Sequence, residues 1–292
     1  MNWICRRDFL KLAGAGGAFL ITCRSGVSFA AGGESVRFIQ ISDTHIGFSD
    51  PAINPEYATT LKKAVAAINA MEAQPDFVVF TGDLTHTTDD PVERKKRLVE
   101  FKNIVDGLRV KDVRFLPGEH DAALDKGEAY QEVLGPMHYA FTRNGVAFLA
   151  VDNVSDPSGS VGDAQREWMG QELKKLSTTD PIVILTHRPL FDLAPDWDWA
   201  TRDGAQVMEL LTAHQNVTVL YGHIHQVHHH ETGRIGHHAA AGMMYPLPAP
   251  MSVPKKGPIP WDPAAPYKGL GYREARQSAG AGVPALTEIP MA

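Results

Sequence analysis

The 292-residue sequence has little cysteine, little positive charge and no long apolar run. Its only cysteines, Cys5 and Cys23, both lie in the first 30 residues. If that segment is removed, no thiolate remains, which excludes a disulfide, a cysteine nucleophile and a zinc–thiolate site. The formal net charge is -6, and residues 1–30 carry +3, which leaves -9 on the rest. An acidic body of this kind argues against nucleic acid as a partner.

Residues 1–30 have the three parts of an export signal. The segment RRDFLK at positions 6–11 resembles the twin-arginine consensus, a weakly apolar stretch follows to residue 22, and Ser28-Phe29-Ala30 offers small residues for cleavage. The apolar stretch is shorter than the roughly 20 residues of a membrane span. We therefore expect a twin-arginine signal peptide over residues 1–30, recognition by the twin-arginine export machinery, a periplasmic protein and no membrane anchor after signal removal.

Strand-like apolar runs alternate with helical patterns between residues 36 and 220. The expected strands are Val36–Ile41, Phe77–Phe80, Val113–Leu116, Val146–Val151, Ile182–Leu185 and Val217–Leu220, and the expected helices cover 54–73, 92–108, a segment from Asp163, and 206–214. This alternation predicts an α/β domain.

The chain changes character after Met243. Eight prolines crowd residues 246–266, which excludes a helix or a central strand there. We expect an extended connection on the domain surface, an edge strand over Tyr272–Arg276 and loose final residues.

Short blocks of acidic and histidine residues follow five of the apolar runs. They are Asp43-Thr44-His45, Gly82-Asp83, Gly118-Glu119-His120-Asp121, Thr186-His187 and Gly222-His223-Ile224-His225. One block alone would be weak, since Asp residues after strands often cap turns. Ligands of open α/β sheets bind outside the carboxyl ends of the strands. The five blocks together therefore predict one cleft ringed by carboxylates and imidazoles, which are ligands of divalent transition metals.

In this order the blocks resemble those of the calcineurin-like metallophosphoesterases. The resemblance implies a four-layer α/β/β/α sandwich of two mixed β-sheets flanked by helices. It places the metallophosphoesterase domain at residues 34–245 and leaves a Pro/Gly-rich C-terminal extension, 246–292, that packs on the domain.

The resemblance also implies a role for each motif residue. Asp43, His45 and His225 would bind a first metal, Asp83 would bridge both metals, and Glu119, His187 and His223 would bind the second. His120 would be catalytic, and Asp121 would hydrogen-bond it and fix its tautomer. The implied cofactors are two divalent ions, Fe, Mn or Zn, and the implied reaction is hydrolysis of a phosphate monoester or diester in a small substrate by a metal-activated hydroxide.

Glu119 departs from the family pattern, which usually has asparagine at this position. A carboxylate binds a divalent ion more tightly but leaves the site one charge less positive, and it could instead act as a base. The alternative function is therefore a phosphoesterase-fold metal-binding or assembly protein with little turnover.

Three further features lie outside the five blocks. His86 is either solvent-facing and outside the metal shell or an extra ligand. His228–His230 form a strand with alternate side chains outward, where weak adventitious metal binding is possible. Trp197 and Trp199 either line the substrate entrance or pack within their own loop.

Overall fold

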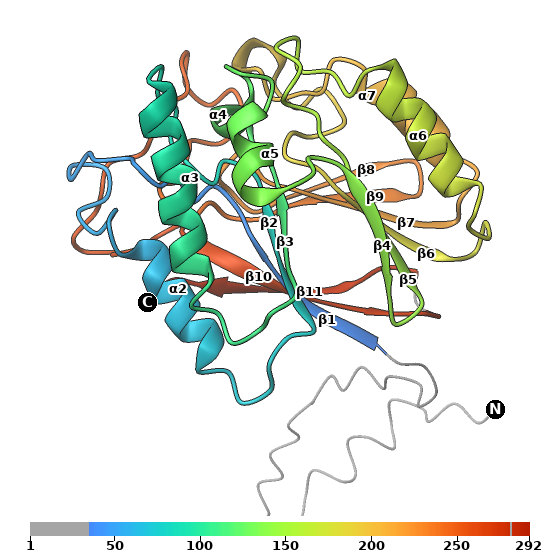
Figure 1. Ribbon diagram of the computed structural model, residues 1–292, viewed down its shortest axis with the longest axis horizontal. Coiled ribbons are helices and arrows are strands. Elements are labelled where there is room, and N and C mark those ends of the chain that lie inside the picture. The colour runs from blue at the N-terminus through green and yellow to red at the C-terminus, as the bar shows by residue number, and fades with distance from the viewer. Residues whose placement is uncertain (1–34, 281) are drawn as a thin grey trace, which may run out of the picture. The chain divides into compact units, whose positions relative to one another are not determined.

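The computed structural model describes residues 35–280 and 282–292 (Figure 1). The expected export signal at residues 1–30 lies outside the described residues, so it stays a prediction. Within the described ranges, no helix has both the length and the apolar character needed to cross a membrane.

The first sheet contains five strands in the order β11-β10-β1-β2-β3. They are β1 (Ser35–Ile41), β2 (Phe77–Thr81), β3 (Val113–Leu116), β10 (Gly271–Ser278) and β11 (Ala285–Pro290). Strands β1, β2 and β3 are parallel, while β10 is antiparallel to both of its neighbours.

The second sheet contains six strands in the order β4-β5-β6-β7-β9-β8. They are β4 (Tyr139–Arg143), β5 (Val146–Ala150), β6 (Pro181–Leu185), β7 (Asn216–Tyr221), β8 (His228–Thr232) and β9 (Ile235–Ala239). Strands β5, β6, β7 and β9 are parallel, and the edge strands β4 and β8 run antiparallel. Both sheets are thus mixed.

The helices cover the outer faces of the two sheets. They are α2 (Thr60–Asn69), α3 (Pro91–Val105), α4 (Glu119–Ala122), α5 (Glu128–Leu134), α6 (Asp163–Leu173) and α7 (Gly204–Leu211), with a 3-10 turn η1 (Pro195–Trp197). Helix α3 begins sharply because the Asp90 carboxylate accepts hydrogen bonds from the Val92 and Glu93 amides, with Pro91 in the first turn. Helix α2 is shorter than expected, since the Asn54 side chain donates to the Met244 carbonyl and holds the preceding residues as a loop.

Three hydrophobic clusters separate four layers. Leu61 of α2 and Leu98 of α3 pack with Phe80 of the first sheet, and Met169 of α6 and Val207 of α7 pack with Ile184 of the second. A third cluster joins the two sheets, where Phe38 and Phe77 of the first contact Phe148 of the second. Figure 1 shows α2 and α3 on one side of the sheets and α6 and α7 on the other. The predicted four-layer α/β/β/α sandwich is confirmed.

The C-terminal segment contributes more to the first sheet than its sequence suggested. Residues Tyr272–Arg276 do form a strand, but the prediction of an edge strand is wrong, because β10 lies between β1 and β11. The final residues are not loose, since 285–290 form β11. The charges of β10 are satisfied by neighbouring strands: Arg37 pairs with Glu274 at 2.5 Å and buried Arg273 pairs with Glu288 at 2.6 Å. The charged residues of β10 therefore do not identify it as an edge strand of the sheet.

Candidate metal centre

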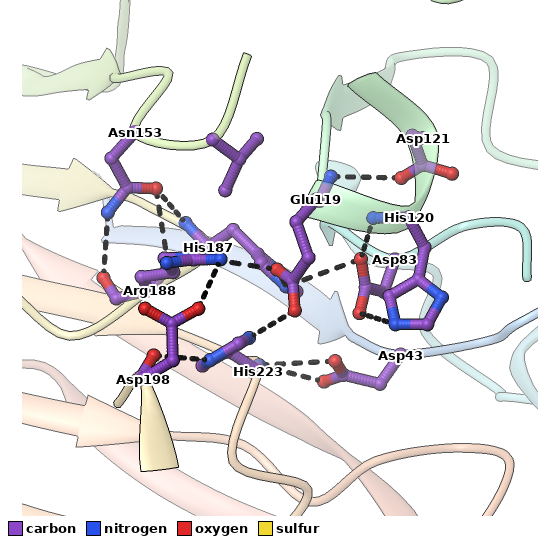
Figure 2. Close-up of polar contacts among 12 residues, drawn as sticks. Asp43, Asp83, Glu119, His120, Asp121, Asn153, His187, Arg188, Asp198 and His223 are labelled. Carbon is purple, nitrogen blue, oxygen red and sulfur yellow. Dashed lines mark hydrogen bonds and ion pairs between the residues drawn. The ribbon is translucent and has the colours of Figure 1, made fainter. Parts of the chain in front are cut away.

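The five motif blocks follow β1, β2, β3, β6 and β7 and meet beyond the carboxyl ends of these strands. Their ligand atoms form two groups in which all atoms lie within 4.8 Å of one another: Asp43, His45, Asp83 and His225, and Asp83, Glu119, His187 and His223. The structure therefore brings all seven predicted metal ligands together, in two groups that share Asp83. Figure 2 shows the second group converging, with Asp43 beside it.

The two carboxylate oxygens of Asp83 face different groups. Oδ2 lies 3.6 Å from His45 Nε2, whereas Oδ1 lies 3.5 Å from His187 Nε2. On the first side, His225 Nε2 is 3.1 Å from His45 Nε2 and 3.4 Å from Asp43 Oδ1. This is the arrangement that a carboxylate bridging two cations requires.

On the second side, Glu119 connects two histidines. Its Oε2 lies 3.0 Å from His187 Nε2 and its Oε1 lies 2.9 Å from His223 Nδ1. Glu119 thus lies between the two histidines that are predicted to bind the second metal with it.

Three of the histidines are oriented by backbone carbonyls. His187 Nδ1 and His225 Nδ1 each donate to a carbonyl oxygen at 2.7 Å, from Thr81 and Tyr245, and His223 Nε2 donates to that of Asp198 at 3.2 Å. A carbonyl oxygen only accepts, so in each neutral ring the opposite nitrogen carries a lone pair that points into the site.

The buried acceptors of the second group fit a divalent cation. His187 Nε2, His223 Nδ1 and Glu119 Oε2 are buried and have no hydrogen-bond partner. Lone-pair nitrogens and a carboxylate at 3 Å from one another repel unless a proton or a cation lies between them. Two imidazoles and two carboxylates per cation suit Fe, Mn or Zn.

Burial sets the charge of the site before any ion enters. It raises the pKa of Asp43 to about 7 and lowers the pKa of His225 to about 3, and it also lowers the pKa of His45. Burial and Glu119 push the pKa of Asp83 upward, but His120 and His187 outweigh them and lower it overall. Burial lowers the pKa of His187, but Asp83 and Glu119 outweigh it and raise that pKa well above its usual value. A divalent ion would therefore displace a proton from His187, whereas His45 and His225 are already in the neutral form that metal binding needs.

Backbone strain is concentrated in the predicted ligands. Five of the seven have positive φ: Asp43 at 58°, His45 at 42°, Asp83 at 48°, His223 at 66° and His225 at 52°. Non-glycine residues adopt this left-handed region at an energetic cost, and such residues cluster at functional sites. The motif glycines permit the close packing beside them, since a Cβ on Gly118 would lie 2.0 Å from Asp83 Oδ1.

His120 borders the centre without belonging to either group of four. Its Nε2 lies 3.8 Å from Asp83 Oδ2, and the Thr87 amide donates to its Nδ1 at 3.1 Å. Because Nδ1 accepts, a neutral His120 ring carries its proton on Nε2, the nitrogen that faces the site.

The predicted role of Asp121 is wrong. Its carboxylate accepts from the amides of Leu84, Thr85 and Gly118 at 2.8–2.9 Å and holds the loop after β2 against α4. Consecutive helical residues point in different directions, so Asp121 turns into the protein while His120 faces the site. The Thr87 amide fixes the His120 tautomer instead.

The sequence profile of the calcineurin-like phosphoesterases matches residues 36–227. The chain belongs to the calcineurin-like phosphoesterase family. Over 203 residues it is 27% identical to a probable cyclic nucleotide phosphodiesterase of Rhodococcus erythropolis, covering 64% of each chain. Over 149 residues it is 29% identical to the serine/threonine-protein phosphatase CPPED1 of Danio rerio, covering 46% of this chain and 47% of that one. The chain thus spans between about half and two thirds of the length of these curated relatives.

A solved structure shares the fold. The crystal structure of a dimetal phosphatase from Danio rerio covers 88% of this chain and 99% of its own, with a TM-score of 0.57 and 14% sequence identity. The family assignment therefore rests on the sequence profile, and the structural likeness supports the sandwich architecture.

Around this family centre lie residues that the sequence analysis did not identify. Asn153, just beyond β5, accepts from the amides of His187 and Arg188 at 3.3 Å and donates to the Arg188 carbonyl at 3.0 Å. The Asp198 carboxylate lies 2.9 Å from Arg188 Nη2. The backbone carbonyl of Asp198 accepts a hydrogen bond from His223 Nε2. Figure 2 shows this network beside Glu119. The position of Asn153 directly after a strand was the one available signal.

The open interpretations are partly decided by burial. Trp197 and Trp199 are 4% and 0% exposed and pack with Ile224, so they fill their own loop and do not line an entrance. His86 is half-buried, with Nδ1 3.4 Å from His45 Nδ1. With His45 and His120 it forms a third possible metal-binding group, separate from the two sets of four, so the extra-ligand interpretation stays open.

Proposed function

We propose that the protein hydrolyses a phosphate monoester or diester in a small substrate, using two divalent ions held by the seven motif residues. The observation that carries this proposal is Asp83, whose two oxygens face two separate groups of metal-ligand atoms. Membership of a phosphoesterase family supports the reaction type. The relatives are named for both a cyclic diester and phosphoprotein substrates, so their names favour neither class of ester.

Each part of the centre has a task in such a reaction. When bound, the ions would clamp the phosphate and lower the pKa of a water molecule toward neutrality. Asp83 reduces the repulsion between the two cation positions, and the neutral imidazoles add ligand atoms without negative charge. His120 presents Nε2–H toward the site, where it would donate a proton to the leaving oxygen.

The test combines elemental analysis with two generic substrates. We expect about two Fe, Mn or Zn ions per purified chain, and hydrolysis of p-nitrophenyl phosphate, bis-p-nitrophenyl phosphate or both. Two metals without hydrolysis of either ester would support the alternative, a metal-binding or assembly protein on this fold. A chain that binds fewer than two metals at saturation would refute the dinuclear centre.

We also propose that the protein is exported to the periplasm. The RRDFLK segment at positions 6–11 and the small residues before position 31 support twin-arginine export to the periplasm. Replacing Arg6 and Arg7 by lysine should leave the full-length protein in the cytoplasmic fraction, and unchanged periplasmic recovery would contradict this route.

A further inference from the structure

Glu119 creates a charge problem for a site that must bind phosphate. Asp43, Asp83 and Glu119 would together contribute three formal negative charges against the four positive charges of two divalent ions. An asparagine at position 119 would leave the centre one unit more positive. The attraction of the centre for an anion depends on its net positive charge. A compensating cation is therefore needed close to Glu119.

Arg188 is placed to supply that charge. It directly follows His187, and its Nε lies 3.6 Å from Glu119 Oε2. The residue is 8% exposed, and Asn153 holds its backbone at both the amide and the carbonyl. Its Nε is buried without a hydrogen-bond partner, while Nη2 pairs with the largely exposed carboxylate of Asp198. A guanidinium so fixed can offer unused donors to an oxyanion with little loss of entropy.

A second cation approaches the same side of the centre from the Pro-rich segment. Lys256 is half-buried, and its Nζ lies 5.6 Å from the centroid of the Trp199 ring. Trp199 directly follows Asp198 in the sequence. Within residues 35–280 and 282–292 it makes no ion pair. Burial lowers the pKa of Lys256, Glu119 and Asp198 raise it, and Arg188 lowers it further.

We infer that Arg188 and Lys256 form a cationic subsite beside the second metal position, which offsets the charge of Glu119 and binds a non-bridging oxygen of the substrate's phosphate. The inference rests on the proposed function for the identity of the substrate. It favours a doubly charged phosphomonoester over a singly charged diester, because each added cation attracts the dianion more strongly. In the absence of substrate the Asp198 carboxylate pairs with Arg188, and the phosphate oxygen would replace Asp198 in that ion pair.

The first test uses inorganic phosphate as the probe and measures its binding by calorimetry at saturating metal. Arg188→Met should weaken phosphate binding about tenfold, the loss expected for one charge-assisted hydrogen bond. Metal content, measured on the same samples, should stay at the wild-type value. In the double variant Glu119→Asn with Arg188→Met, phosphate affinity should return to within about threefold of wild type, because the charge that Arg188 offsets is gone.

A buried arginine can also matter for folding, so Lys256 provides the second test. Lys256→Met changes a side chain on a surface segment and should raise KM for p-nitrophenyl phosphate about threefold to tenfold, with kcat nearly unchanged. The effect on bis-p-nitrophenyl phosphate should be smaller. Lys255→Met is the matched control, since Lys255 is the exposed neighbour and should have no effect.

The outcomes separate this inference from the proposed function. If the wild type hydrolyses its ester but Arg188→Met binds phosphate as tightly as wild type and Lys256→Met leaves KM unchanged, the subsite is refuted and the function stands. If no ester is hydrolysed but phosphate binding still depends on both residues, the subsite stands and the function fails. A wild type that neither hydrolyses esters nor binds phosphate overturns both.

Discussion

Two regions of this protein are rich in histidine, and they differ in what surrounds the rings. At the candidate metal centre, His187, His223 and His225 each have one nitrogen bound to a backbone carbonyl and the other directed at a carboxylate. The second region consists of five histidines, which we call the β8–β9 histidines: His228, His229, His230, His237 and His238. In the described part of the chain none of these five makes an ion pair with a carboxylate.

The β8–β9 histidines contact one another and aromatic rings instead. His229 and His238 lie opposite each other in the ladder with their Nδ1 atoms 2.6 Å apart, and the His230 ring stacks on Phe191 at 3.9 Å. Burial lowers the pKa of both His237 and His238 to about 4, so both are neutral near pH 7. In the described residues, the β8–β9 histidines thus lack the carboxylates that both groups of four at the candidate metal centre contain.

Among variants that test the difference between the two histidine-rich regions, Asp83→Asn should have the largest effect on metal content and activity. The variant keeps the shape of the side chain but removes the charge between the two cation positions, so both metals should be lost. Activity should fall by at least about a thousandfold, because the ions supply most of the catalysis. Elemental analysis and ester kinetics measure both effects. Retention of two metals would mean that Asp83 is not the bridge.

His120→Ala should separate catalysis from metal binding. We expect two metals per chain to remain, because His120 is outside both groups of four, while kcat falls about 100- to 10,000-fold through loss of the proton donor. Metal content and kcat are measured on the same preparation. An empty centre in this variant would assign His120 to the metal shell.

The pH dependence of metal stabilisation tests the carboxylates. Because burial raises the pKa of Asp43 to about 7, its proton stabilises the metal-free fold at low pH, and this contribution is lost as the pH rises from about 4 to 7. Metal binding requires the ionised form, so protons compete with the ion below pH 7. The increase in Tm on adding Mn²⁺ should therefore be larger at pH 8 than at pH 6, measured by calorimetry against a chelator-treated sample. An equal increase at both values would show that Asp43 does not lose a proton on binding.

The smallest effect is expected in the β8–β9 histidines. The double variant His229→Ala with His238→Ala should keep the wild-type metal content and kcat, with a stability change of about 1 kcal/mol or less for this partly exposed pair. Loss of one bound ion per chain would break the contrast drawn above and place a metal at the edge of the second sheet.

The sequence was informative wherever structure depends on neighbours in the chain. The apolar runs predicted β1, β2, β3, β5, β6 and β7, and the blocks after five of them predicted that their side chains meet, because parallel strands bring their carboxyl ends to one edge. Four of the five blocks, all except Thr186-His187, contain a glycine or a left-handed Asp or His where the chain turns away from its strand, and that turn is local. The order of strands was less accessible: the inner position of β10 depends on pairing between Arg273 and Glu288 and on contacts with β1.

The sequence by itself determined the types of the candidate ligands, their order and the strand ends from which they project. Only the tertiary structure decided which ring nitrogen each histidine directs into the site. It also decided that Asp121 supports a loop, that the Thr87 amide hydrogen-bonds His120, and that Arg188 lies close to Glu119. The reason is physical: hydrogen-bond direction and charge balance depend on distances of a few ångströms between segments far apart in the chain. Local patterns carry no information on those distances.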